Sequence, residues 1–292
     1  MIGNKLTKYI LIAVGTICML ICVACGVSLY QFYRGAQSEA ALTQQAKLEA
    51  TTSENTPEET TTVEQKIPFP DAEAVLESDE PVAEPVEIPI DFAQLAEISS
   101  DIYAWLEIPD TEIDKPVLQH PGDDLYYNTH NAFGEYYMCG AVFSQETYND
   151  RSFDAPMTIL YGHGTVLGQP GAFHELNNYA DQGYFDTHRK IVIYTPSAMY
   201  VYRVFAAFVH GREHLLYYYN FTDPVILTGF FQTVRQIADP NYSHFDDSCM
   251  PEPDDKVLAL STCFEPDKSR RYLVMGVLEE THPAASDNEQ EK

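Results

Sequence analysis

Basic residues are scarce in this 292-residue chain, in which 17 lysines and arginines stand against 44 aspartates and glutamates. The resulting formal net charge of −27 repels a phosphate backbone, which argues against nucleic-acid binding. Beyond residue 30 the chain also has no CxxC or HExxH pair, no glycine-rich phosphate loop and no GxSxG elbow. We therefore expect neither a metal site nor a cofactor.

Cysteines are also few. Three of the six lie in an apolar run near the N-terminus, and the others are Cys139, Cys249 and Cys263. An odd number of cysteines in an exported domain leaves at least one thiol unpaired, which favours a free reactive cysteine. A disulfide between Cys139 and Cys249 is compatible with this count, and so is its absence.

Residues 9–30 form a nearly continuous apolar run without a charge. A helix needs about 20 such residues to cross the hydrocarbon core of a membrane, and a removable signal peptide usually has a shorter apolar centre. Lys5 and Lys8 precede the run, whereas only Arg34 follows it closely. The positive-inside rule then predicts a single-pass anchor in the cell membrane, with residues 1–8 in the cytoplasm and the rest outside. Lipidation at Cys25 is an alternative with a faint motif.

Residues 31–88 are rich in Glu, Thr, Ala and Pro and poor in aromatic residues. Such a composition cannot bury enough surface to offset the entropy of ordering, and charge repulsion keeps it extended. We expect a disordered acidic linker here, which would act as a stalk. A folded domain at 89–281 and a polar tail at 282–292 follow.

The folded domain is expected to be mostly β. Short apolar runs separated by turn signals predict strands at 139–143, 158–161, 191–194, 200–209, 257–260 and 272–278. Apolar residues at spacings of three and four from Phe92 to Trp105, after the potential N-cap Asp91, predict an amphipathic helix. Another helix is predicted from Asp223 to about Ala238.

Reactive side chains lie at the ends of the predicted strands. Cys263 follows the strand at 257–260, and Arg270 and Arg271 open the next one. A reactive thiol needs nearby positive charge, and an acyl-transfer oxyanion needs a fixed donor. His163 ends the strand at 158–161 between two glycines, and a Cys–His pair requires only adjacency in space. The alternative is a buried core cysteine, a structural histidine and a solvated basic pair.

Several motifs in the same order resemble those of the sortases. Leu260-Ser-Thr-Cys263 with an arginine opening the next strand resembles their signature, and Ile159-Leu-Tyr-Gly-His163 resembles their histidine motif. Trp105-Leu-Glu-Ile-Pro109 and Ile113-Asp-Lys-Pro-Val117 are similar to the start of their domain. The resemblance covers about residues 90–280, and the helix at 223–238 resembles the insertion of the class B branch. It implies a closed β-barrel with peripheral helices.

The resemblance also assigns roles to residues. Cys263 matches the nucleophile and His163 the catalytic histidine. Arg271 is preferred to Arg270 as the family's arginine because an apolar strand follows it directly. Tyr161, Ser261 and Thr262 are weaker candidates for substrate binding, and Glu265 lies near a position where some class B members have an acid.

The activity that the resemblance implies is cysteine transpeptidation at the outer face of a Gram-positive-type envelope. Surface proteins with a C-terminal sorting motif would be cleaved through a thioester and joined to an amine of a peptidoglycan precursor. Two alternatives stay open at this point. One is a pilin-polymerising sortase, which uses a lysine of another subunit as the acceptor, and the other is a catalytically silent surface-binding module.

Overall fold

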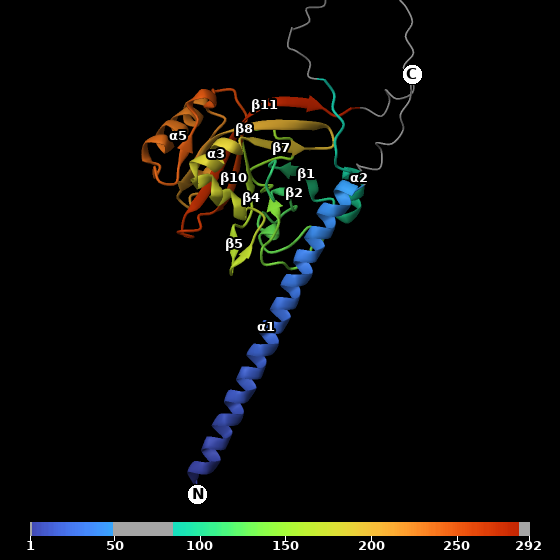
Figure 1. Ribbon diagram of the computed structural model, residues 1–292, viewed down its shortest axis with the longest axis vertical. Coiled ribbons are helices and arrows are strands. Elements are labelled where there is room, and N and C mark those ends of the chain that lie inside the picture. Colours follow the sequence, from blue (N-terminus) through green and yellow to red (C-terminus); the bar gives the residue numbers. More distant parts are fainter. Residues whose placement is uncertain (1, 49–83, 286–292) are drawn as a thin grey trace, which may run out of the picture.

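The protein was analysed as a computed structural model that describes residues 2–48 and 84–285. Its centre is a closed barrel of eight strands, in the order β11-β10-β4-β3-β2-β1-β7-β8, closed by pairing of β8 with β11 (Figure 1). The strands are β1 (Ile102–Glu107), β2 (Asp114–Leu118), β3 (Val142–Phe143), β4 (Met157–Tyr161), β7 (Lys190–Tyr194), β8 (Ala198–His210), β10 (Val257–Cys263) and β11 (Arg271–Pro283). The prediction of a mostly-β closed barrel is confirmed.

Two strand pairs lie outside the closed ring. The short β9 (His244–Phe245) pairs with Ala206 and Ala207 of β8, beyond the stretch of β8 that pairs with β7. A separate hairpin is formed by β5 (Thr165–Val166) and β6 (Gln169–Pro170).

The strands that carry the site are buried on both faces. Leu258 and Leu260 of β10 point into the barrel interior, whereas Val257 and Ala259 face a second apolar cluster on the outside. Helix α5 (Pro224–Ile237) supplies Phe230 and Phe231 to that outer cluster. Because both faces are covered, β10 reads in the sequence as a continuous apolar run and not as a strict alternation.

Helices and 3-10 turns surround the barrel. Asp223 caps α5 by accepting a hydrogen bond from the Val225 backbone at 2.9 Å, and Pro224 opens the helix, as predicted. The remaining short elements are α2 (Phe92–Ile98), η2 (Tyr126–Asn128), η3 (His174–Ala180), α3 (Gln182–Thr187), α4 (Leu215–Tyr218) and η4 (Asp247–Cys249).

The prediction of one helix from Phe92 to Trp105 is wrong in its second half. Helix α2 ends at Ile98, where the Ser99 backbone donates to the Leu95 carbonyl, and Trp105 belongs to β1. Residues 102–106 are all buried, so the three- and four-residue spacing reflects a strand buried on both faces. The predicted strand at 139–143 is also shorter, because Gly140 has a φ of +58° and the strand begins at Val142.

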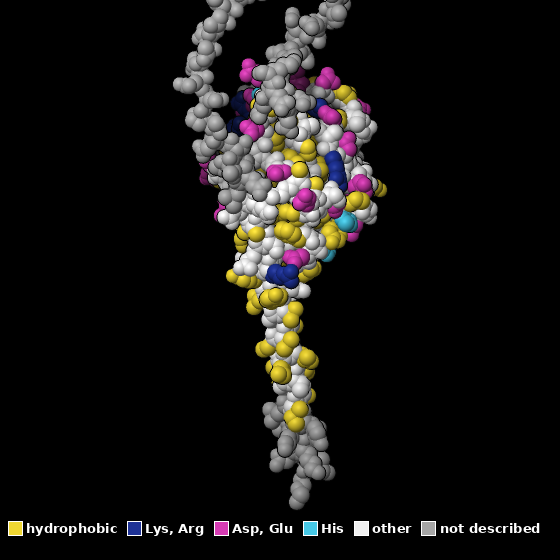
Figure 2. Space-filling model, turned by 90° about the vertical axis from the view of Figure 1, so that its right-hand side faces the viewer, with side chains coloured by type: hydrophobic (Ala, Val, Ile, Leu, Met, Phe, Trp, Pro, Cys, Tyr) yellow, Lys and Arg dark blue, Asp and Glu magenta, His cyan; other side chains and the backbone are white. Residues whose placement is uncertain are grey.

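Helix α1 (Ile2–Leu48) extends well beyond the predicted span at 9–30. It is long and apolar enough to cross a membrane, and Figure 2 shows hydrophobic side chains along the face of the helix turned to the viewer. Residues 31–48, predicted as linker, continue the helix because its end packs on the domain, where Leu42 and Ala46 are fully buried. Glu39 accepts a hydrogen bond from the Ala132 backbone at 3.0 Å. These domain contacts stabilise a helix that composition alone did not predict.

The other domain boundaries also differ from the prediction. Residues 49–83 of the expected linker and 286–292 of the expected tail lie outside the described residues. At the domain's edge, Val86 donates to the Pro283 carbonyl at 2.9 Å and accepts from Ala285 at 2.9 Å. The ordered domain therefore begins before residue 89, and β11 continues past residue 281.

Candidate active site

Three neighbouring strands bring Cys263, His163 and Arg271 to one end of the barrel. In the parallel β4–β10 pair each residue lies opposite the one 100 positions later, up to Tyr161 and Ser261. The Gly162 backbone donates to the Ser261 carbonyl at 3.2 Å, which carries the pairing one step further and brings His163 level with Cys263. On the other side of β10, Cys263 is the register partner of Arg271 in β11.

The guanidinium of Arg271 lies against the sulfur of Cys263. Its Nη1 is 3.3 Å from the Sγ atom, and both side chains are partly buried. The loop between the two strands is closed by hydrogen bonds from Phe264 to the Arg270 carbonyl and from Asp267 to the Phe264 carbonyl, at 3.1 Å each. The arrangement thus places a permanent cation beside a free thiol.

His163 is held by a backbone carbonyl. Its Nε2 lies 2.9 Å from the Asn128 oxygen, and because a carbonyl can only accept, Nε2 carries the proton. The other ring nitrogen, Nδ1, is then the acceptor of the neutral ring. Burial lowers the pKa of His163 below its ordinary value, and the charges of Arg271 and Lys268 act in the same direction. A neutral His163 is therefore favoured for the free protein at pH 7.

Neighbouring side chains lie close to both glycines beside His163. A Cβ atom on Gly162 would lie 2.8 Å from the Phe173 ring, and one on Gly164 would lie 2.7 Å from Glu265 Oε1. Neither glycine has a positive φ, so the backbone conformation does not require glycine at these two positions. They allow Phe173 and Glu265 to pack against the histidine loop.

A cavity of about 210 Å³ joins the predicted residues. His163, Cys263 and Arg271 line it together, as do all three weaker candidates, Tyr161, Ser261 and Thr262. Arg270 does not belong to the lining.

Glu265 also lies outside the cavity lining. It accepts a hydrogen bond from the Thr165 backbone at 2.6 Å and pairs with Lys268 at 3.4 Å. These contacts give it a structural role between the loop after Cys263 and the β5–β6 hairpin.

Several lining residues were missed by the sequence analysis. The segment 210–215, which begins at the last residue of β8, lines the cavity together with Asn128, Phe143 and Gln145. The polar run His210-Gly-Arg-Glu-His214 after a long apolar strand was the available signal in the sequence. Gln145 and Asn128 carry no local signal, because their place in the cavity depends on contacts with distant strands.

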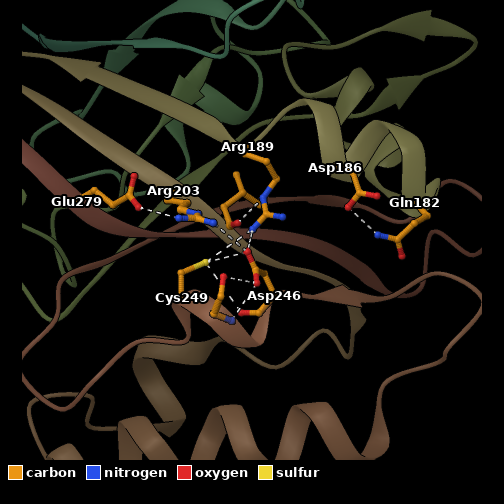
Figure 3. Close-up of polar contacts among 9 residues, drawn as sticks. Gln182, Asp186, Arg189, Arg203, Asp246, Cys249 and Glu279 are labelled. Atoms are coloured by element: carbon orange, nitrogen blue, oxygen red, sulfur yellow. Dashed lines mark hydrogen bonds and ion pairs between the residues drawn. The ribbon is translucent and has the colours of Figure 1, made fainter.

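Cys139 and Cys249, the two cysteines of the barrel domain that lie outside the cavity, are both free. Cys139 is buried and Cys249 is half-buried, so the disulfide that remained possible between them is not formed. Cys249 lies beside Asp246 in a cluster with Arg189 and Arg203, at the junction of β8 with η4 (Figure 3).

Comparison with known proteins agrees with this geometry. The family model of the sortase domain matches residues 106–279. Sortase B of Listeria monocytogenes is 27% identical over 177 residues, which cover 61% of this chain and 68% of that protein. The crystal structure of a Streptococcus pyogenes class B sortase involved in pilus biogenesis is 25% identical, with a TM-score of 0.53 over 65% of this chain and 98% of that one.

A Bacillus anthracis sortase B structure shares the fold, with a TM-score of 0.61 at 22% identity over 86% of this chain and 99% of that one. The match of the family model to more than half of the chain shows that it belongs to the sortase family, whose members are cysteine transpeptidases. Within the family it is a class B sortase, as its helix between β8 and β10 had suggested. A catalytically silent binding module is no longer needed to explain the chain.

Proposed function

We propose that Cys263, His163 and Arg271 are the catalytic residues of this sortase, acting on surface proteins that carry a C-terminal sorting motif. The observation that carries the proposal is the 3.3 Å contact between the Arg271 guanidinium and the Cys263 sulfur in a cavity that His163 also lines. A thiol, a proton carrier and a fixed cation are the groups that acyl transfer through a thioester requires.

The first half of the reaction forms the thioester. His163 accepts the thiol proton at Nδ1, because its Nε2–H is held by the Asn128 carbonyl. The Cys263 thiolate attacks the carbonyl carbon of the scissile threonine, and the Arg271 guanidinium stabilises the oxyanion that develops. When the intermediate collapses, His163 returns the proton to the leaving amine, so that the C-terminal fragment departs as a neutral amine.

The second half transfers the surface protein to an acceptor. An amine of a peptidoglycan precursor attacks the thioester, loses a proton to His163 and forms the new amide, while the sulfur of Cys263 leaves as the thiolate. The S. pyogenes relative involved in pilus biogenesis makes a pilin lysine the second candidate acceptor. The same three residues would serve either amine, so the acceptor must be decided by experiment.

We also propose that α1 anchors the enzyme with its N-terminus in the cytoplasm and its barrel outside the cell. The support is the 47-residue helix with its apolar window, together with the lysines that precede the apolar run. The helix end packs against the domain through Leu42 and Ala46, which holds the barrel close to the membrane surface.

The proposal is tested by incubating the full chain in detergent with a panel of sorting-signal peptides. Intact-mass spectrometry is expected to show an acyl adduct on Cys263 that a peptidoglycan-type amine or a lysine peptide then removes. Peptide mapping that places the adduct on another residue, or no adduct with any peptide, would contradict the assignment. Transfer to the lysine peptide alone would favour pilin polymerisation over wall anchoring.

A further inference from the structure

The apolar run of α1 ends beside the loop 130–137 of the barrel domain. No lysine, arginine, aspartate or glutamate occurs between Lys8 and Arg34, so Arg34 marks the point where the helix leaves its apolar region. Its guanidinium pairs with Glu135 at 2.8 Å, and Glu135 also accepts a hydrogen bond from Ser38 at 3.2 Å. If α1 crosses a membrane, these contacts hold the loop at the level of the membrane surface.

The loop 130–137 is a turn with a fixed backbone. Oδ1 of the buried Asn131 accepts hydrogen bonds from the Phe133 and Glu135 backbones at 3.1 and 3.0 Å. The Asn131 backbone donates to the Glu135 carbonyl at 3.0 Å, and Gly134 has a φ of +71°, which glycine adopts at little cost. The turn leaves 42% of the Phe133 side chain exposed.

A groove of about 400 Å³ lies between this loop and the last turns of the apolar run. It is lined by Val27 and Tyr30 of the helix and by Tyr136 of the loop, next to the ion pair of Arg34. Val27 precedes Tyr30 by almost one helical turn and belongs to the apolar run. At least half of each of these three apolar side chains is exposed. Tyr136 therefore lies beside helix residues that a bilayer would surround.

Close packing fixes the loop relative to the axis of α1. Gly35 is buried, and a Cβ atom on it would lie 2.5 Å from the Tyr137 ring. The Phe32 ring contacts the same tyrosine, with centroids 5.8 Å apart. Figure 2 shows hydrophobic side chains where the barrel meets the helix. The depth of α1 in a membrane thus sets the depth of the loop.

We propose that the loop 130–137 is a second membrane contact of this protein, with Phe133 and Tyr136 in the headgroup region of the bilayer that α1 crosses. This inference rests on the proposed anchoring by α1. Lipid is the occupant of the groove because the groove continues the apolar surface of the membrane-crossing run. A tyrosine ring, with its apolar body and polar tip, suits this region of a bilayer.

The contact is aromatic and not electrostatic. The cation nearest the groove, Arg34, is paired with Glu135, and the chain has a net charge of −27, which disfavours attraction to anionic headgroups. With α1 and the loop both at the surface, the barrel is held at two points. It can then no longer swing about the helix, so its active-site end keeps one orientation toward the membrane.

The test uses tryptophan fluorescence, because the single tryptophan of the chain, Trp105, is fully buried. Tyr136→Trp and Phe133→Trp are made in the full chain and reconstituted into phosphatidylcholine vesicles whose acyl chains carry bromine near the headgroup. Bromine quenches an indole that touches it. After subtraction of the wild-type emission, each introduced indole is expected to lose most of its emission relative to vesicles without bromine.

The matched control is Ile237→Trp at the end of α5, on the side of the barrel away from α1 (Figure 1). Ile237 is 73% exposed, and an indole there should be quenched little by bromine but strongly by aqueous iodide. Melting temperatures show which variants are folded, and either loop variant alone decides the matter if the other does not fold.

Quenching by bromine at positions 133 and 136 no stronger than at 237 would overturn the inference. So would indoles at the loop that neither bromine nor iodide reaches, because a protein partner would then cover the loop in place of lipid. Failure of the wild-type chain to float with the vesicles would instead refute the proposed anchoring by α1, on which the inference rests.

Discussion

Two half-buried cysteines of this protein have charged neighbours of opposite sign closest to their sulfur atoms. Cys263 has the Arg271 guanidinium at 3.3 Å, whereas Cys249 has a carboxylate oxygen of Asp246 at the same distance. Burial raises the pKa of Cys249 above that of an ordinary thiol, and the hydrogen bond to Asp246 adds to the increase. The two thiols are similarly exposed, but their nearest charges differ in sign. A neighbouring cation favours a thiolate and a neighbouring carboxylate disfavours it.

The surroundings of Cys249 and Cys263 also differ in how many of their polar groups are hydrogen-bonded. Asp246 accepts hydrogen bonds from the Ser248 backbone and hydroxyl at 2.9 and 2.7 Å, and it pairs with Arg189 and Arg203 (Figure 3). In the cavity around Cys263, the amide nitrogen of Gln145 has no hydrogen-bond partner among the described residues. The hydrogen bonds and ion pairs of Asp246 hold the segment after α5 on the barrel. The cavity around Cys263 is open to a substrate.

The largest difference in activity is expected between alanine variants of the two cysteines. Cys263→Ala is expected to abolish acyl-adduct formation and peptide cleavage, because no other described thiol lines the cavity. Cys249→Ala should retain nearly all of the wild-type kcat, since its contacts are with Asp246 and Arg189. Acyl-adduct formation and peptide cleavage are measured for both variants with the same sorting peptide. Residual turnover in Cys263→Ala, or its loss in Cys249→Ala, would reverse the assignment.

A second large effect separates the two adjacent arginines. Arg271→Ala is expected to lower kcat by on the order of a hundredfold or more, the usual cost of losing an oxyanion donor. Arg270→Ala should change kcat little, because Arg270 does not line the cavity. Steady-state kinetics of both variants decide the matter, with melting temperatures to show that each is folded. A larger loss for Arg270 than for Arg271 would show that the choice between them is wrong.

The sequence predicted the site better than it predicted the segments around it. Cys263 ends an apolar strand, His163 closely follows one and Arg271 opens one, so local pattern singled out all three residues. Their convergence depends on register, in which β4 lies parallel to β10 and β11 antiparallel. No local pattern encodes that register, and the resemblance to sortases implied only a closed barrel and the roles of the three residues.

What the sequence did not predict depends on contacts between distant segments. Residues 31–48 read as linker by composition, yet Leu42 and Ala46 become buried once α1 meets the domain. Trp105 fitted a helical spacing because β1 is buried on both faces. Its sequence therefore lacks the alternation of apolar and polar residues that would have indicated a strand. Gln145 and His214 are 69 residues apart, and neither has a motif, so their hydrogen bond could be found only in three dimensions.

The smallest effect concerns Asp246, whose removal should make Cys249 more like an exposed thiol. In Asp246→Asn the carboxylate that helps raise the Cys249 pKa is lost, so its pKa is expected to fall. Alkylation of Cys249 by iodoacetamide near pH 8 should then become several-fold faster. The rate at Cys263 is expected to stay unchanged and serves as the internal control, with peptide mapping to separate the two sites. Equal Cys249 rates in variant and wild type would mean that burial alone protects this thiol.

The same variant has a stability effect with a defined pH dependence. Hydrogen bonds from Ser248 and the pairing with Arg189 hold the pKa of Asp246 well below its usual range. A carboxyl group with a depressed folded-state pKa stabilises the fold at pH values above its unfolded pKa of about 4, and this contribution is lost as the pH falls toward the folded value. Asp246→Asn should therefore cost roughly 1–3 kcal/mol at neutral pH. The gap in melting temperature from wild type should narrow below about pH 4, and a gap independent of pH would show that the ionised carboxylate is not what stabilises this cluster.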